Sequence, residues 1–157
     1  PRHQLWMCSK NKGGSRAADI RYRTPSGATG KLYGLTVPYV ILFFHDPDCG
    51  MCREVAMRMD ASPAIRKLID AGRLVVLCIY ADEDEQAWRS HVAQMPLQGW
   101  IYGWDKWQTL RTQESYDLHA TPTLYLLGPR QEVLVKNGVF PAIEQMCVEL
   151  DNPVTNE

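Results

Sequence analysis

A nearly continuous apolar run leads directly into a pair of cysteines and then into a helical pattern. The run is YVILFFH, residues 39–45, and the cysteines are Cys49 and Cys52, with Gly50 and Met51 between them. Apolar residues without alternation are typical of a strand buried on both faces of a sheet. We therefore expect residues 39–44 to form a central strand, with the cysteine pair between its end and the start of a helix.

Helical and strand patterns alternate along the rest of the chain. Helical spacing over residues 50–70 is interrupted at Ser62 and Pro63, a typical N-cap and first-turn proline, which predicts a kink or two consecutive helices. The other predicted elements are a hairpin of residues 19–23 and 31–35, a strand at 73–81, a helix at 82–95, strands at 121–128 and 131–138, and a helix at 140–150. This order predicts an α/β fold with a mixed central sheet and helices on both faces.

Composition and charge exclude several classes of protein. A chain of 157 residues, 45% hydrophobic and 22% charged, suits one compact domain that folds without disulfides. A net charge of −1 and a pI near 6.5 give no reason to expect nucleic acid or an anionic membrane as a partner. No apolar run approaches the roughly 20 residues that span a bilayer. Because the chain starts at Pro1 without a signal sequence, we expect a mature or excised segment.

The cysteine pattern leaves several roles to weigh. The chain contains five cysteines: Cys8, Cys49, Cys52, Cys78 and Cys147. An odd number excludes a framework in which every cysteine is paired. A metal site is not expected, because only His45 and Cys78 offer further soft ligands near the pair and a second CxxC is missing. A structural disulfide across so short a loop would constrain the unfolded chain little. We expect Cys78 to be a buried apolar residue, and pairing of Cys8 with Cys147 stays open.

Three features together resemble the thioredoxin fold: Cys49-Gly-Met-Cys52 after a central strand, the distant Thr121-Pro122 that leads a strand, and the order of elements. The resemblance covers roughly residues 19–150. The hairpin ahead of the core is similar to that of the extracytoplasmic TlpA- and ResA-like thiol-disulfide oxidoreductases, and DPDCGMC and TPTLYLLG are similar to exported thioredoxin-like domains of the Bacteroidetes type.

The resemblance implies a thioredoxin-like three-layer sandwich in a single domain, residues 1–157. Within it, an N-terminal extension and hairpin would occupy residues 1–38, the thioredoxin core residues 39–150, and a tail residues 151–157.

The position of the pair suits redox chemistry. A cysteine at a helix N-terminus faces unpaired N–H groups and the positive end of the macrodipole, which favour the reactive thiolate. Cys49, just outside the helix, is therefore expected to be the nucleophile, and Cys52 the resolving thiol. The resemblance further implies that Pro122 is cis and packs beside the sulfurs, and that the backbone of Thr121 pairs with the substrate. Met51, exposed between the cysteines, would contact partner chains.

Around the pair the chain departs from the family pattern. Asp48 stands where an aromatic residue is usual, and His45 where a tryptophan is usual. The carboxylates of Asp46 and Asp48 should oppose a thiolate on Cys49 and nearly cancel the effect of the helix terminus. A protonated His45 would favour the thiolate, whereas a histidine at the end of a buried strand can also be packed and neutral.

Two further features leave alternatives open. ResA-like proteins carry a glutamate three residues after the second cysteine, but here Val55 stands there and Glu54 lies one place earlier, about 100° round the helix. Glu54 is therefore either a proton acceptor for the pair or an exposed helix carboxylate. An aromatic cluster either lines a substrate groove or packs against the sheet, and we favour packing. Its members are Trp100, Tyr102, Trp104 and Trp107.

These observations lead to a functional hypothesis. The domain is predicted to be an enzyme that exchanges disulfides with protein thiols through Cys49 and Cys52, without a bound cofactor. At Cys49 the helix terminus and the carboxylates of Asp46 and Asp48 nearly cancel, which favours a reductant or isomerase over a strong oxidant. The resemblance implies an extracytoplasmic location and an external electron donor. The alternative is a non-catalytic partner-binding module of a larger exported protein. A peroxide-reducing relative is less favoured, because Arg53 is the one suitable residue near the pair in sequence.

Overall fold

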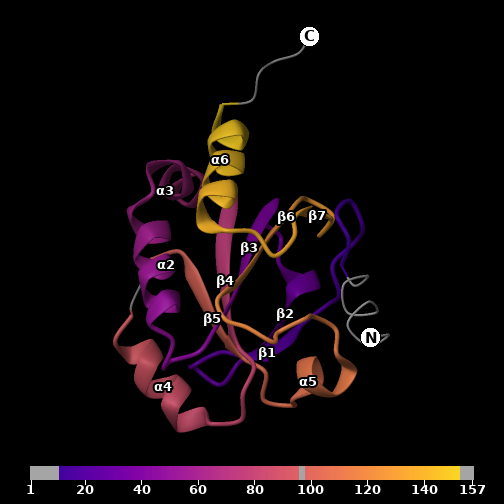
Figure 1. The fold of residues 1–157 in the computed structure, drawn as a ribbon, viewed down its shortest axis with the longest axis vertical. Coiled ribbons are helices and arrows are strands. Elements are labelled where there is room, and N and C mark those ends of the chain that lie inside the picture. Colours follow the sequence, from indigo (N-terminus) through magenta and orange to yellow (C-terminus); the bar gives the residue numbers. More distant parts are fainter. Residues whose placement is uncertain (1–10, 96–97, 153–157) are drawn as a thin grey trace.

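Seven strands form one mixed sheet in the computed structural model, which describes residues 11–95 and 98–152 (Figure 1). The strand order is β2-β1-β5-β4-β3-β6-β7. The strands are β1 (Arg21–Arg23), β2 (Thr29–Lys31), β3 (Tyr39–His45), β4 (Leu74–Tyr80), β5 (Trp100–Trp104), β6 (Thr123–Leu127) and β7 (Val133–Val135). β3 and β4 are parallel, as are β4 and β5, and the other neighbours are antiparallel. The predicted mixed sheet is confirmed.

The expected central strand is β3, which lies between β4 and β6. Every residue of β3 after Tyr39 is buried. Alternate side chains face two apolar clusters, because successive side chains of a strand point to opposite faces. Ile41 and Phe43 join one cluster, and Leu42 and Phe44 join the other. The unbroken apolar run is therefore explained by burial on both faces.

Five α-helices and one 3-10 helix accompany the sheet within the described residues. They are η1 (Leu32–Gly34), α2 (Gly50–Ala61), α3 (Pro63–Asp70), α4 (Glu85–Ala93), α5 (Thr109–Gln113) and α6 (Phe140–Asp151). The interruption predicted near Ser62 separates two helices. Ser62 Oγ accepts the backbone N–H of Ile65 at 3.4 Å, and Pro63 takes the first position of α3. Ser62, directly after α2, thus caps the next helix with its side chain.

Helices cover the two faces of the sheet unevenly. Side chains of α2, α3 and α6 pack with Ile41 and Phe43 in one cluster, and α4 lies on the same face, where Trp88 stacks on Trp104 with ring centroids 5.9 Å apart. The other face is covered by η1, the short α5 and irregular segments (Figure 1). The three-layer thioredoxin-like sandwich is confirmed, with long helices on one face and short ones on the other.

The N-terminal hairpin is part of the main sheet, because β1 pairs with both β2 and β5. The first strand of the predicted hairpin is confirmed as β1. The second, predicted at residues 31–35, is wrong: pairing with β1 ends at Lys31, and η1 follows. The backbone groups of this segment are paired outside a strand: Leu35 donates its N–H to the Leu32 carbonyl oxygen at 3.1 Å, and the Asp19 carboxylate accepts the N–H of Tyr33 at 2.9 Å.

The aromatic cluster of residues 100–107 packs against the sheet and the hairpin. Trp100 and Trp104 on β5 are only 8% and 7% exposed. Trp107 lies under the guanidinium of Arg21, 3.8 Å from the ring centroid. These contacts support the packing alternative over a substrate groove.

Gly103 on β5 provides a test of how tightly the hairpin packs on the sheet. A Cβ at this position would lie 2.8 Å from Tyr22 Cγ and 2.8 Å from Ile79 Cδ1. Gly103→Ala should therefore lower the free energy of unfolding by about 1–3 kcal/mol, as overpacking does, measured by urea denaturation. Gly34→Ala is the matched control, because a Cβ there meets nothing within 4 Å. Equal stability of the two variants would contradict this packing.

Candidate active site

The turn between β3 and α2 is formed by Asp46 and ends at Cys49. Asp46 Oδ1 accepts the backbone N–H of Asp48 at 3.0 Å, and the Asp46 carbonyl oxygen accepts the backbone N–H of Cys49 at 3.0 Å. Cys49 then occupies the N-cap of α2 with an extended backbone. The buried strand and this turn together place Cys49 at the positive end of the helix.

Cys49 and Cys52 form a disulfide in the structure, with their Cα atoms 5.2 Å apart. Cys49 Sγ also accepts the backbone N–H of Cys52 at 3.0 Å. A backbone N–H directed at the sulfur, together with the helix macrodipole, favours the thiolate of Cys49 once the pair is reduced.

The two sulfurs differ in their access to solvent. Cys49 is partly exposed, whereas Cys52 is only 3% exposed and belongs to the apolar cluster beneath α2. Met51, between them, is 62% exposed. A partner thiol or disulfide would therefore meet Cys49 first, and Cys52 is placed to react with Cys49.

The peptide bond between Thr121 and Pro122 is cis, as the resemblance predicts. Cys49 Sγ lies 3.7 Å from the carbonyl oxygen of Thr121, although the two residues are 72 positions apart in sequence. The segments meet because β3 and β6 are antiparallel, with Phe44 opposite Thr123. The end of β3 and the start of β6 thus lie at the same edge of the sheet.

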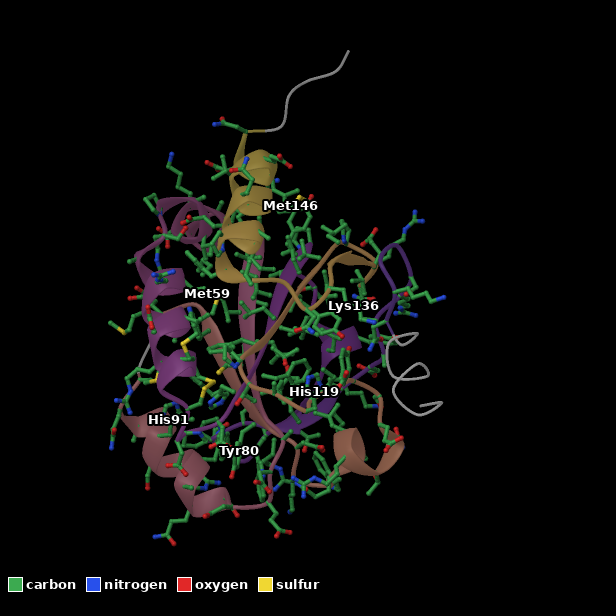
Figure 2. The ribbon with its side chains drawn as sticks, viewed as in Figure 1. Met59, Tyr80, His91, His119, Lys136 and Met146 are labelled. Carbon is green, nitrogen blue, oxygen red and sulfur yellow. A yellow bond between two sulfur atoms is a disulfide. The ribbon has the colours of Figure 1, made fainter. Side chains whose placement is uncertain are left out.

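His45 ends β3 and is buried, with an exposed fraction of 4%. Its ring stacks on His91 of α4 with centroids 5.2 Å apart, and Figure 2 shows His91 on that helix. Burial, and to a smaller extent the neighbouring His91, lowers the pKa of His45 to about 3. His45 is therefore neutral near neutral pH. Of the two alternatives left open for His45, this supports the packed, neutral side chain over a protonated one that favours the thiolate.

Glu54 and Asp48 both lie in solvent. Glu54 pairs with Arg58 on the next turn of α2 at 3.5 Å, and 59% of its side chain is exposed. This placement supports the exposed-carboxylate alternative and gives no support to a proton-accepting role. Asp48 is exposed directly before Cys49, where its charge can act on the sulfur.

The other described cysteines are buried thiols. Burial raises the pKa of Cys78 well above its ordinary value, and burial followed by the nearby Glu144 raises the pKa of Cys147 to about 12. Both thiols are therefore poor nucleophiles at neutral pH. Cys8 lies outside the described residues, and with it the predicted alternative of a Cys8–Cys147 pair.

Over residues 11–95 and 98–152 we find no group of three or more His, Cys, Asp or Glu side chains that could hold a metal ion. None of the described helices combines the length and hydrophobicity that crossing a bilayer requires.

A cleft of about 320 Å³ has Asp46 and Thr121 in its lining, and nothing in the sequence signals it. It is lined by the ends of β3 and β4, by α5 and by the segment that leads to Thr121. Figure 2 labels two of the lining residues, Tyr80 and His119, at the lower end of the sheet. Leu110, Glu114 and Tyr116 belong to the lining, but no motif marks them because only the folded chain brings them to the ends of β3 and β4.

The buried imidazole of His45 should make the protein less stable in acid. The unfolded chain binds a proton on His45 below about pH 6.5, whereas the folded chain resists protonation until about pH 3. Stability therefore falls as the pH is lowered through this window. His45→Leu should remove about 2 kcal/mol of the stability difference between about pH 7 and about pH 4.5, measured by urea denaturation. An unchanged difference would mean that the imidazole is protonated in the folded state.

Comparisons with known proteins agree with this geometry. A family model described as a thioredoxin-like domain matches residues 31–148. A solved thioredoxin-like protein from Bacteroides caccae is 39% identical, with a TM-score of 0.90 over 94% of this chain and 53% of that chain. The C-terminal domain of an uncharacterized protein from Bacteroides fragilis is 36% identical, with a TM-score of 0.86 over 90% of this chain and all of that domain.

A more distant similarity is to a longer protein. Nucleoredoxin from Xenopus laevis is 26% identical over 120 residues, which are 76% of this chain and 28% of nucleoredoxin. The chain thus spans less than a third of that relative and about half of the Bacteroides caccae chain. The family model, the shared fold and the cysteine pair beside the cis Thr121–Pro122 bond lead to one conclusion: the chain belongs to the thioredoxin-like domain family.

Proposed function

We propose that this domain is a thiol-disulfide oxidoreductase that exchanges disulfides with protein thiols through Cys49 and Cys52. The observation that carries the proposal is the unequal placement of the two sulfurs. Cys49 is partly exposed at the N-cap of α2, and Cys52 is 3% exposed behind it. This reaction requires two thiols with different access. The nucleophile must contact the substrate, and the resolving thiol needs to reach only the sulfur of the nucleophile.

The reaction needs only these sulfurs and a substrate disulfide. In the reduced protein the Cys49 thiolate attacks one substrate sulfur and bonds to it, while the other substrate sulfur leaves as a thiolate and takes up a proton. Cys52 then loses its proton and attacks Cys49 Sγ. The substrate leaves as its second thiol, and the Cys49–Cys52 disulfide forms. Two electrons pass from the protein to the substrate, and the reverse sequence oxidises a substrate dithiol.

Thr121, Pro122 and Met51 are proposed to bind the substrate chain. The backbone of Thr121 lies beside Cys49, at 3.7 Å from its sulfur, so an extended substrate segment could pair with it as an added strand does. Pro122 follows without a backbone N–H of its own. Met51 is 62% exposed between the cysteines, and its flexible side chain suits varied apolar partners.

The charges near Cys49 support a reductant or isomerase over a strong oxidant, which needs a strongly stabilised thiolate. The helix N-terminus stabilises the charge, but Asp46 and Asp48 oppose it, and the neutral His45 adds no positive charge. We further propose that an external electron donor restores the dithiol. The likeness to TlpA- and ResA-like proteins supports an extracytoplasmic place of action.

A trapping experiment tests the roles of the two sulfurs. Cys52→Ser should attack a substrate disulfide but fail to resolve the product, so a mixed disulfide through Cys49 accumulates, because the resolving thiol has been removed. Cys49→Ser should trap nothing. The adducts are measured by mass spectrometry after incubation with a protein disulfide. Limiting iodoacetamide should label Cys49 of the reduced parent first, ahead of Cys52 and the buried Cys78.

The same experiment separates the enzyme from a partner-binding module of a larger exported protein. A module would bind its partner without turnover, and neither single variant would differ from the parent. If the Cys52→Ser protein turns over a disulfide as fast as the parent, or if Cys52 is labelled first, the assigned roles are wrong.

Asp48→Asn tests the electrostatic part of the proposal. Removing a like charge next to Cys49 should lower the pKa of its thiol and raise the redox potential of the pair, because the thiolate form gains stability. Thiolate absorbance during a pH titration measures the first change, and equilibration with glutathione the second. Glu54→Gln is the matched control: it removes an exposed charge that is already paired with Arg58. An effect of Glu54→Gln equal to that of Asp48→Asn would revive the proton-acceptor alternative.

A further inference from the structure

The chain between α5 and β6 has no regular secondary structure, and we call residues 115–121 of it the Thr121 segment. Among the described residues, this segment takes part in no backbone–backbone hydrogen bond. One end is held locally, because the Thr123 hydroxyl donates to the carbonyl oxygen of Ala120 at 2.7 Å. The other end depends on residues far away in sequence, although the segment places the carbonyl oxygen of Thr121 only 3.7 Å from Cys49 Sγ.

Tyr116 anchors that other end to the core. Its side chain is 2% exposed, and its ring centroid lies 5.1 Å from that of Phe44 on β3 and 5.4 Å from that of Tyr125 on β6. The Tyr116 hydroxyl donates a hydrogen bond to the carbonyl oxygen of Ala18, which is 98 residues earlier in the chain. Burial raises the pKa of Tyr116 above its ordinary value, so the hydroxyl keeps the proton that it donates.

Asn11 joins the same two parts of the chain. Its Nδ2 donates to the carbonyl oxygen of Ser115 at 2.8 Å, and its Oδ1 accepts the backbone N–H of Ala18 at 2.9 Å. Together with the Tyr116 hydroxyl, these bonds connect residues 11–18 directly to the start of the Thr121 segment. We call residues 11–18 the N-terminal brace.

The N-terminal brace is itself fixed to other parts of the fold. Gly14 donates its backbone N–H to the carbonyl oxygen of Val133 on β7 at 2.8 Å, and Val133 donates its own N–H to that of Ser15 at 2.8 Å. The hydroxyl of Tyr33, on η1, donates to the carbonyl oxygen of Ala17. The brace can therefore support the Thr121 segment from outside it. It lies ahead of the residues that the family model matches.

We infer that Tyr116 and Asn11 are positioning residues: through the N-terminal brace they hold the backbone of Thr121 where it can pair with a substrate chain. The inference rests on the proposed redox function, in which this backbone binds the substrate beside Cys49. If the Thr121 segment moved away, Cys49 would keep its reactivity but lose the groups that orient a peptide disulfide. The rate with peptides would then follow the fraction of molecules in which the segment is in place.

The test compares two disulfides in the Cys52→Ser background. One is a short peptide whose single cysteine is joined to thionitrobenzoate, and the other joins mercaptoethanol to thionitrobenzoate. Cys49 bonds to the sulfur of the peptide or of mercaptoethanol, and thionitrobenzoate leaves as a coloured thiolate that gives the rate. Only the peptide has a backbone that can pair with Thr121. The ratio of the two rates therefore reports backbone pairing separately from the reactivity of Cys49.

Tyr116→Phe removes the hydroxyl and keeps the buried ring. We expect the ratio of rates to fall about twofold to tenfold, because one hydrogen bond to the brace is lost. Hydrogen exchange of residues 115–121 should become faster. Asn11→Ala should act in the same direction. Tyr33→Phe is the matched control: it removes a hydroxyl that donates to Ala17 in the brace but breaks no bond to the Thr121 segment, so the ratio should not change.

The outcomes separate this inference from the proposed function. If hydrogen exchange of residues 115–121 is unchanged by Tyr116→Phe, the brace does not hold the segment, and the inference is wrong. If exchange becomes faster but the ratio of rates is unchanged, the brace has no role in substrate binding, and the redox role stands. A ratio that Tyr33→Phe lowers as much as Tyr116→Phe does would also overturn the inference. If Cys49 attacks neither disulfide, the proposed redox function itself fails, and the inference fails with it.

Discussion

Burial of β3 on both faces is the constraint on which the rest of the structure depends. The strand pairs with β4 on one side and β6 on the other, so its two ends cannot shift without breaking both ladders. Because β6 is antiparallel to β3, the segment before β6 begins at the edge where β3 ends. Strand pairing thus brings Cys49 Sγ to 3.7 Å from the carbonyl oxygen of Thr121, although neither residue is itself in a strand.

The geometry at that edge gives the two cysteines different surroundings. The Asp46 turn leaves Cys49 at the N-cap of α2, and the first helical turn carries Cys52 into the apolar cluster. In the function that we propose, the helix N-terminus and the nearby carboxylates act on Cys49 in opposite directions, and the buried His45 adds no charge because desolvation keeps it neutral. A few partly exposed charges would then tune the site, and salt and single substitutions would change them.

Local patterns in the sequence were enough to predict much of the fold and the centre of the site. The apolar run identified β3, Ser62 and Pro63 marked the break between α2 and α3, and the CxxC spacing placed two sulfurs at a helix start. These features depend on residues within a few positions of one another, where backbone propensity and capping decide the conformation. The cis bond before Pro122 was predicted from resemblance to a family, and composition or periodicity alone would not reveal it.

Other properties were decided by tertiary structure, because they depend on partners far away in sequence. The strand predicted at residues 31–35 is replaced by η1, where Leu35 donates its N–H to the Leu32 carbonyl oxygen and the carboxylate of the distant Asp19 accepts the N–H of Tyr33. The protonation state of His45 follows from burial against α4, a helix that begins 40 residues later. The cleft is built from the ends of β3 and β4 together with the segment before Thr121. By itself the sequence determined the order of elements and placed two cysteines at a helix start, which are the residues of the proposed chemistry. Long-range packing decided their exposure and their neighbours, since only the folded chain sets desolvation and contact between distant segments.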